Sequence, residues 1–292
     1  MPVAPQPIAY QGSKRRLAAS ILRHLPRDTA TFFEPFVGSG AMTLAAALHN
    51  RAQQFVIGDT LHPLAGIWHH LVQSPDQLSE GYAALWHAQL PDPRGHYLAV
   101  RAAFNLRPQP DQLLYLLARC VKNAVRFNAL GQFNQSADHR RLGTQPAQMA
   151  QNIRRAHRLL AGRTQVHAGD YGHLLHSALP TDVVYLDPPY AGVSQGRDPR
   201  YAQTLDFERF VSNLAAANQR GTAFLVSFDG RCGDKTFGPP LPDGLGLRRL
   251  EIAVGRSSQA TLHGRDEQTV EALYLSQALV RRLATFGQAT MS

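Results

Sequence analysis

Short apolar runs recur along the chain, and most of them are followed by segments with the residue spacing of an amphipathic helix. The runs predict strands within "ATFFEPFVG", "QFVIGD", "RTQVHAGD", "DVVYLDPPY", "TAFLVSFDG", "LRRLEIAV" and "TVEALYLS". Helical patterns lie between Gly12 and Pro26, after Gly40, and around residues 207–218. Strands that alternate with helices predict an α/β fold, a mostly parallel sheet with helices on both faces. The last two runs, joined by a polar loop, predict a C-terminal β-hairpin.

Residues 66–164 interrupt this alternation. They hold helical periodicity in "LLYLLARCVKNAVRF", several prolines, and the polar stretch "NALGQFNQSADHRRLGTQP". The pattern predicts that residues 1–65 and 165–292 form one α/β domain, into which residues 66–164 insert a mainly helical domain.

The charge of the chain is concentrated in this insert. The protein has a net charge of +9, and its basic residues are 27 arginines and 3 lysines. Arginine suits phosphate and guanine edges, although a GC-rich genome also favours arginine codons. Residues 66–164 contain twelve basic and five acidic residues, whereas the rest of the chain contains eighteen and sixteen. This distribution favours a polyanion-binding surface on the insert.

Several classes of protein are disfavoured by what the sequence lacks. No apolar run approaches the roughly 20 residues that span a bilayer, and "MPVAPQPIAY" lacks the pattern of a signal peptide, so we expect a cytoplasmic protein. Cys120 and Cys232 have no metal-ligand spacing, and we expect buried thiols and no metal site.

Four predicted strands end in glycine-rich or acidic sequence, at Phe36–Gly40, Asp59, Asp170 and Asp187. In parallel sheets, ligands bind outside the carboxyl ends of the strands, so these positions predict one shared site. The glycine-rich turn lacks both the dinucleotide and the P-loop spacings, which disfavours NAD and ATP. Asp59 is placed to bind ribose hydroxyls or to cap a helix, and Asp170 to bind an adenine amino group or to cap the next helix.

The stretch "DPPY", Asp187 to Tyr190, is the most specific element. A tight turn requires neither the aspartate nor the tyrosine. The arrangement suits methylation of an exocyclic amine, because a carboxylate and a backbone carbonyl that accept its two N–H groups direct the nitrogen lone pair at an electrophile. Pro188 and Pro189 fix the backbone, and Tyr190 offers a flat face for a base removed from its helix. Catalysis would then rest on positioning and electrostatics.

Taken with "YQGSK", "FFEPFVGSG", "VIGD", "RFNALGQFN", "VHAGD" and "TVEALYLS", this motif resembles the DNA adenine methylase family of S-adenosylmethionine-dependent adenine-N6 methyltransferases. The match covers most of the chain in the family's order, and the basic insert lies where the family has its target-recognition domain. The resemblance implies a Rossmann-like methyltransferase sheet, S-adenosylmethionine as cofactor, and double-stranded DNA as substrate. It also implies base flipping, and either a solitary enzyme or the partner of a restriction endonuclease.

The resemblance also implies roles for individual residues. The base-binding and catalytic residues would be Asp187, Pro188, Pro189 and Tyr190. Those at the cofactor would be Tyr10, Lys14 (near the methionine carboxylate), Glu34, Phe36, Gly38, Gly40, Asp59 (at the ribose), Asp170 and Tyr171. Those at the DNA would be Arg126, Asn128, Asn134, Arg140 and Arg141.

Two positions depart from the family pattern, since His62 replaces a frequent asparagine and Gln135-Ser136 replaces a usual proline. Two other functions compete with DNA adenine methylation. One is transfer to a different nucleic-acid amine, either RNA adenine or cytosine N4, and Asp187 favours DNA adenine over both. The other is a catalytically silent DNA-binding protein, which the intact motifs disfavour.

Overall fold

The protein was analysed as a computed structural model that describes residues 3–189, 205–232, 235–236, 239–256 and 268–289. Tyr190, the polar loop at 192–201 and the loop of the predicted C-terminal hairpin at 257–267 lie outside the described residues. None of the helices in the described ranges is long and apolar enough to cross a membrane.

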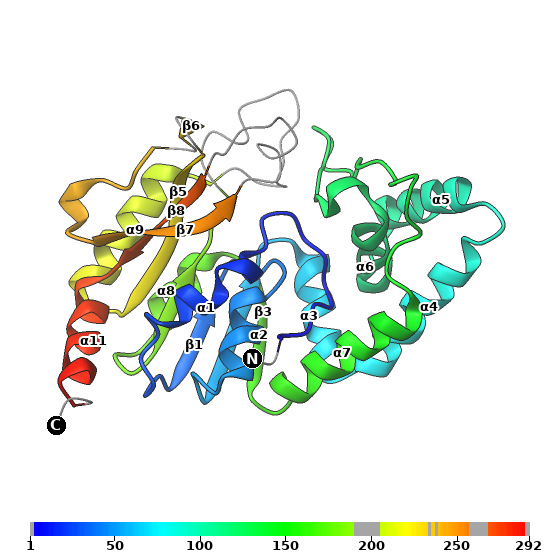
Figure 1. The fold of residues 1–292 in the computed structure, drawn as a ribbon. Helices are drawn as coiled ribbons and strands as arrows, with labels where there is room; N and C mark the ends of the chain where they lie inside the picture. Colours follow the sequence, from blue (N-terminus) through cyan, green and yellow to red (C-terminus); the bar gives the residue numbers. More distant parts are fainter. Residues whose placement is uncertain (1–2, 190–204, 233–234, 237–238, 257–267, 290–292) are drawn as a thin grey trace.

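A single twisted sheet forms the centre of the α/β domain (Figure 1). Its strand order is β3-β2-β1-β4-β5-β8-β7, and a short β6 pairs with β5. The strands are β1 (Thr31–Glu34), β2 (Gln54–Asp59), β3 (Thr164–Ala168), β4 (Val183–Leu186), β5 (Phe224–Cys232), β6 (Lys235–Thr236), β7 (Arg248–Arg256) and β8 (Gln268–Leu275). The first five in the order are parallel, and β8 and β7 continue the sheet antiparallel as the predicted C-terminal pair.

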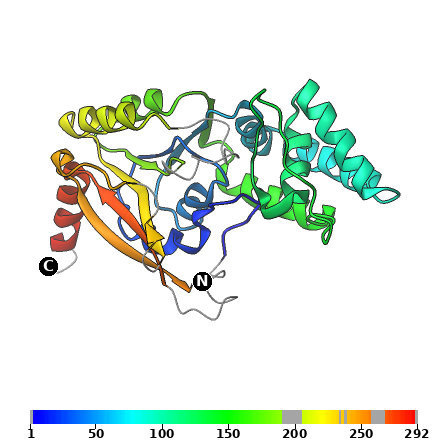
Figure 2. The same cartoon turned by 90° about the horizontal axis from the view of Figure 1, so that it is seen from above.

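The central strands β1, β2 and β4 are buried on both faces of the sheet, which explains why they are apolar without alternation. Phe32 and Tyr185 pack in the core on one face, and their neighbours Phe33 and Val184 pack in a second core on the other. Full burial of each such side chain stabilises the fold by about 1.5–3 kcal/mol. The first core includes α1 (Ala18–Leu22) and α2 (Ala41–Leu48), and the second includes α8 (Tyr171–Ser177) and α9 (Phe207–Gln219). Figure 2 shows α9 and the N-terminal segment on opposite sides of the sheet, and α11 (Gln277–Ala289) ends the described chain.

The first helix is shorter than the sequence pattern predicts. A 3-10 turn (Lys14–Arg16) precedes α1, which ends at Leu22 instead of near Pro26. The guanidinium of Arg51 donates hydrogen bonds to the carbonyls of Leu22 and Leu25, so it satisfies carbonyls that would otherwise be left unpaired at this helix end.

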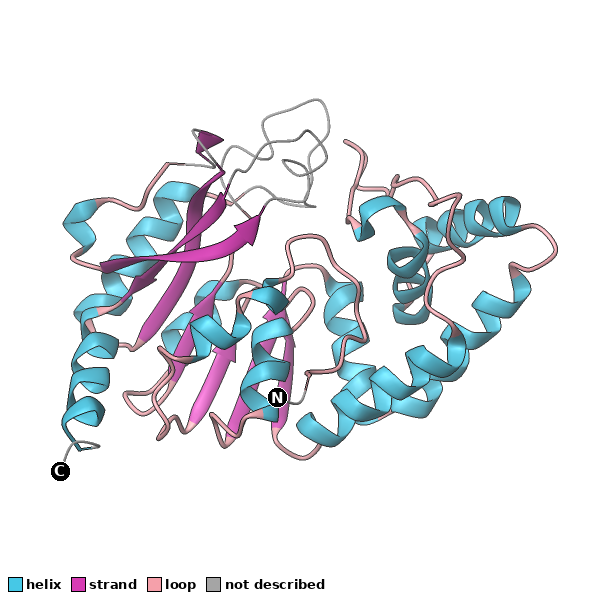
Figure 3. Cartoon of the chain, in the orientation of Figure 1, coloured by secondary structure: helices cyan, strands magenta, loops and turns pink. Residues whose placement is uncertain are grey.

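Helices dominate the chain between β2 and β3, as the sequence predicts, and lie to one side of the sheet (Figure 3). They are α3 (His62–Gln73), α4 (Pro75–Ala88), α5 (Pro93–Leu106), α6 (Pro110–Arg119) and α7 (Pro146–Leu160). Proline suits the first position of a helix, where its missing N–H has no partner to lose. The domain boundary expected at residue 66 falls inside α3, whose buried residues join the core of the sheet.

Residues 120–138 form an irregular antiparallel hairpin, called here the insert hairpin. Although the apolar periodicity runs on, α6 ends at Arg119 because Cys120 is extended and pairs with Ala137. Farther along, Phe127 pairs with Phe133. The Oδ1 atom of Asn128 accepts hydrogen bonds from the backbone N–H groups of Leu130 and Gln132, which closes the tip.

Candidate active site

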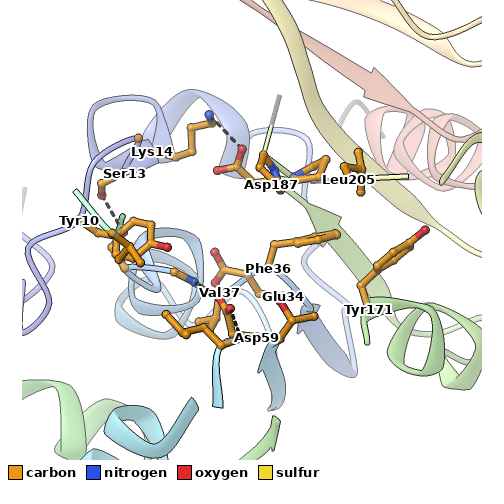
Figure 4. Close-up of a pocket in the computed structure, with 18 of the residues that line it drawn as sticks. Tyr10, Ser13, Lys14, Glu34, Phe36, Val37, Asp59, Tyr171, Asp187 and Leu205 are labelled. Atoms are coloured by element: carbon orange, nitrogen blue, oxygen red, sulfur yellow. Dashed lines mark hydrogen bonds and ion pairs between the residues drawn. The ribbon is translucent and has the colours of Figure 1, made fainter. Parts of the chain in front are cut away.

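A cavity of about 230 Å³ lies at the carboxyl edge of the parallel strands (Figure 4). Ten of the side chains expected at the cofactor and at the target base line it, namely Tyr10, Lys14, Glu34, Phe36, Asp59, Asp170, Tyr171, Asp187, Pro188 and Pro189, together with the backbone of Gly38. They come from the N-terminal loop and from the ends of β1, β2, β3 and β4. The parallel sheet brings segments far apart in sequence to one edge.

The turn after β1 contains two glycines, Gly38 and Gly40, which pack against different aromatic rings. Gly38 and Gly40 have positive φ values of 44° and 60°, which favour glycine. Gly38 faces the ring of Tyr10 in the cavity, whereas Gly40 does not line it. A Cβ atom on Gly40 would collide with the ring of Trp68, whose Nε1 donates a 3.0 Å hydrogen bond to the Gly38 carbonyl. Gly40 is therefore a packing position beneath the turn.

Asp59 connects the ends of β1 and β2. Its Oδ2 accepts a hydrogen bond from the Gly38 N–H at 3.2 Å, and its Oδ1 accepts one from the Leu61 N–H at 3.0 Å. Burial raises the pKa of the Asp59 carboxyl to about 6, although these backbone donors favour its charged form. The Asp59 carboxyl thus holds the turn after β1 and the chain after β2 together where they line the cavity.

Glu34 is buried beside the N-terminus of α2. Its Oε2 accepts hydrogen bonds from both the backbone N–H (2.8 Å) and the hydroxyl of Thr43. Burial raises the pKa of Glu34 to about 8, and the negative charge of Asp187 acts in the same direction. Because its pKa is about 8, the Glu34 carboxyl changes between its neutral and charged forms near neutral pH.

Aromatic rings form the wall beside Asp170. The rings of Phe36 and Tyr171 are stacked with their centroids 5.0 Å apart. Asp170 caps α8 by accepting from the Gly172 N–H, as one of the two sequence interpretations predicts. Both of its oxygens also accept hydrogen bonds from Arg209, at 2.7 and 3.1 Å. The stacked rings therefore form one partly apolar wall of the cavity, and the Asp170 carboxylate is held beside it.

Asp187 follows β4 and forms an ion pair with Lys14, whose Nζ lies 3.0 Å from Asp187 Oδ1 (Figure 4). The same ammonium group also contacts Glu271 of β8. Burial raises the pKa of Asp187 to about 6; Lys14 lowers this pKa and Glu271 raises it. Lys14 therefore lies at the Asp187 end of the cavity, in a cluster of two carboxylates and one ammonium.

The five residues expected at the DNA all belong to the insert hairpin or to the chain just after it. Val125 lines the cavity, so the strand that carries Arg126 starts at the cavity rim. Asn134 and Arg140 have exposed side chains, while Arg141 forms an ion pair with Asp138. Asn128 uses its side chain to close the hairpin tip, and this role supports the loop from within.

Among the residues at or beside the site that the sequence did not single out are Trp68, Arg209 and Glu271. Trp68 and Arg209 lie on helices whose periodicity indicates only burial or exposure. Glu271 stands inside the quoted "TVEALYLS", where a charge in an apolar strand was a usable signal.

With this geometry in place, comparisons with known proteins identify the family. The family described as D12 class N6 adenine-specific DNA methyltransferase matches residues 10–230. The chain belongs to this family. The resemblance seen in the sequence is therefore confirmed, and the chain is a DNA methyltransferase of the adenine-specific class.

Individual relatives agree with this assignment at modest identity. The chain is 28% identical to the DNA N-6-adenine-methyltransferase of Escherichia phage P1 over 76% of its own length, but only 29% of that longer protein. It is 27% identical to a DNA adenine methylase of Vibrio cholerae serotype O1, over 75% of this chain and 79% of that protein. A third relative, the Type II methyltransferase M1.LlaDCHI of Lactococcus lactis subsp. cremoris, is 25% identical over 64% of this chain and 66% of that protein.

Proposed function

We propose that this D12-class enzyme transfers a methyl group from S-adenosylmethionine to N6 of an adenine flipped out of double-stranded DNA. One observation carries the proposal: a single cavity joins the glycine turn and Asp59 to the Asp187-Pro188-Pro189 segment. A donor subsite and an amine subsite thus share one enclosure at the edge of the sheet.

The residues of the cavity suit S-adenosylmethionine. Asp59 would hold the ribose hydroxyls, and the aromatic wall of Phe36 and Tyr171 would contact the adenine ring. The bound cofactor supplies a methyl group on a positively charged sulfur. The Glu34 carboxyl lines the cavity beside the place for this cation, while Gly38 allows close approach to the backbone.

The Asp187 end of the cavity suits an adenine amino group. Lys14 pairs with Asp187 Oδ1, and the Asp187 side chain lines the cavity. Its Oδ2 can accept one N–H of the amine, and a backbone carbonyl of the proline pair can accept the other. The protein then orients the nitrogen lone pair and stabilises the positive charge that develops on nitrogen.

We propose that residues 66–164 are the target-recognition part and that residues 1–65 and 165–292 are the catalytic part. Support comes from the insert hairpin, whose Val125 lines the cavity next to Arg126. Its exposed polar side chains and the positive charge of the insert suit a DNA backbone that passes the cavity. A base leaving the duplex there would have a short path to Asp187.

Methylation of defined substrates tests the proposal. Unmethylated duplex DNA, incubated with the protein and S-adenosylmethionine and then sequenced for N6-methyladenine, should carry the mark at one recognition sequence. Asp187→Ala should lower the rate by roughly 10²-fold or more, with cofactor binding retained in calorimetry. Asp243→Ala, which removes an exposed carboxylate on a 3-10 turn, should match the wild type. Full activity of Asp187→Ala, or methylation only of RNA or of cytosine N4, would refute the proposal.

A further inference from the structure

We infer that Glu271 is a positioning residue of the active site, which holds the Lys14 ammonium beside Asp187 and gives the three-residue cluster a net charge of −1. The inference rests on the proposed function and adds to it a residue from the antiparallel part of the sheet.

The cluster joins three separate parts of the fold. Lys14 comes from the N-terminal 3-10 turn, Asp187 from the end of β4, and Glu271 from β8. All three side chains are at least four-fifths buried, with exposed fractions of 10%, 19% and 13%. An ammonium buried to this extent requires strong partners, and two carboxylates supply them.

The antiparallel direction of β8 explains how Glu271 reaches this site. Because β8 runs opposite to β5, its N-terminal half lies at the carboxyl edge of the parallel strands. An irregularity between Ser227 and Gly230 changes the register, so that Gly230 faces Glu271. Such bulges re-aim side chains next to active sites. A Cβ on Gly230 would come within 2.8 Å of the Val270 carbonyl, so the glycine is needed for this pairing.

The net charge of the cluster matters because of the charge that the reaction moves. The amine nitrogen uses its lone pair to form the N–C bond, while the electron pair of the broken S–C bond stays on sulfur. Positive charge therefore passes from sulfur to nitrogen, and it is discharged when one N–H proton leaves to the Asp187 carboxylate and then to water. An Asp187–Lys14 pair alone would be neutral, whereas the cluster with Glu271 is negative and favours the charged nitrogen.

Glu271 also affects how easily Asp187 takes up a proton. Among the described residues, the charged or titratable groups that face Asp187 are Lys14, Glu271, Glu34 of β1 and Tyr185 of β4, whose hydroxyl is hydrogen-bonded to Ser227. Glu271 raises the pKa of Asp187 and Lys14 lowers it. Removal of the Glu271 charge should therefore shift the protonation of Asp187 to lower pH.

Glu271→Gln tests the inference, because it keeps the shape of the side chain and removes its charge. We expect kcat to fall on the order of tenfold, while the acid limb of the kcat profile moves to lower pH. Glu271→Asp should keep the position of the acid limb and recover part of kcat. Glu251→Gln, the same change at an exposed position of neighbouring β7, is the matched control and should leave both unchanged.

A second measurement does not depend on catalysis. In cofactor-free protein, the ¹³C resonance of the Asp187 carboxyl should titrate at lower pH in Glu271→Gln than in the wild type. An unchanged titration, an unchanged kcat, or a Glu271→Asp variant as impaired as Glu271→Gln would overturn the inference. Wild-type protein that shows the expected titration but methylates no DNA would instead overturn the proposed function.

Discussion

At the scale of single residues, the cavity is defined by acids that burial holds near their neutral form. Burial raises the pKa of Glu34 to about 8 and the pKa values of Asp59 and Asp187 to about 6. Each of these acids sits beside a backbone donor or an ammonium group that partly offsets the cost of its charge. A cationic ligand would complete that compensation, which agrees with the proposed methyl donor.

Glu34 should make the stability of the cofactor-free protein depend on pH. Its pKa is higher in the folded than in the unfolded protein, so its stabilising contribution is full below about 4.5 and is lost as the pH rises through about 8. Glu34→Gln cannot ionise, and its amide oxygen can still accept from Thr43. The variant's melting temperature should therefore fall less than that of the wild type between pH 5 and pH 8.5, roughly the titration window.

Thermal unfolding monitored by circular dichroism measures this difference. Glu208→Gln, at an exposed position of α9, should follow the wild-type curve. Parallel curves for Glu34→Gln and the wild type would show that Glu34 is ionised at little cost in the folded state.

At the scale of elements, side-chain hydrogen bonds of Asn105 and Asn128 hold the backbone of the insert hairpin in place. Asn105 of α5 accepts from the Phe133 N–H and donates to the Phe133 carbonyl, at 2.7 and 3.0 Å. The ring of Phe133 packs against Phe104 in the core of the insert. The hairpin is thus anchored at Phe133, directly after the tip that Asn128 orders.

Asn128→Ala should loosen that tip without unfolding the insert. The substitution removes the acceptor for the Leu130 and Gln132 N–H groups, and each such hydrogen bond contributes about 1 kcal/mol. Hydrogen exchange at these two amides should accelerate, and affinity for duplex DNA should fall by roughly 5-fold. Gln148→Ala on α7 is an exposed control that should change neither quantity. Unchanged exchange would mean that the backbone of the loop alone holds the tip.

At the scale of the whole molecule, the sheet supplies one edge for chemistry, and the insert extends the surface beside that edge. The insert carries most of the net positive charge, yet its helices share a continuous core with one face of the sheet. This shared core connects the proposed DNA-binding surface to the cavity. Under the proposed function, their separation has to suit one flipped nucleotide.

Binding to duplex DNA should weaken steeply with salt, because phosphate contacts release counterions. Removal of Arg140 and Arg141 together should reduce the slope of log K against log salt by roughly 1–2, at about 0.9 per phosphate contact. The matched control removes Arg154 and Arg158 of α7, whose C-terminal end leads to the start of β3, at the edge opposite the cavity (Figure 1). Fluorescence anisotropy at several salt concentrations measures both slopes. Equal reductions would show that net charge, and no particular face, controls binding.

By itself, the sequence determined the α/β fold, the main strands along the chain and the acidic strand ends. Strands buried on both faces must be apolar, and the ligand edge of a parallel sheet lies where those strands stop, so Phe36, Asp59, Asp170 and Asp187 were visible as a group. Local patterns also predicted the helices within residues 66–164, and the residue counts gave the positive charge of this stretch.

Only the tertiary structure decided which groups lie in contact. Trp68 beneath Gly40, Arg209 on Asp170, and Glu271 on Lys14 all depend on residues distant in sequence that meet across helices and strands. The bulge in β5 and the antiparallel direction of β8 bring Glu271 to the carboxyl edge of the parallel strands. Neither feature can be recognised from the spacing of apolar residues in the sequence. The charge of a site is a property of such contacts, because it is set by every ionisable group within a few ångströms, wherever the chain places it.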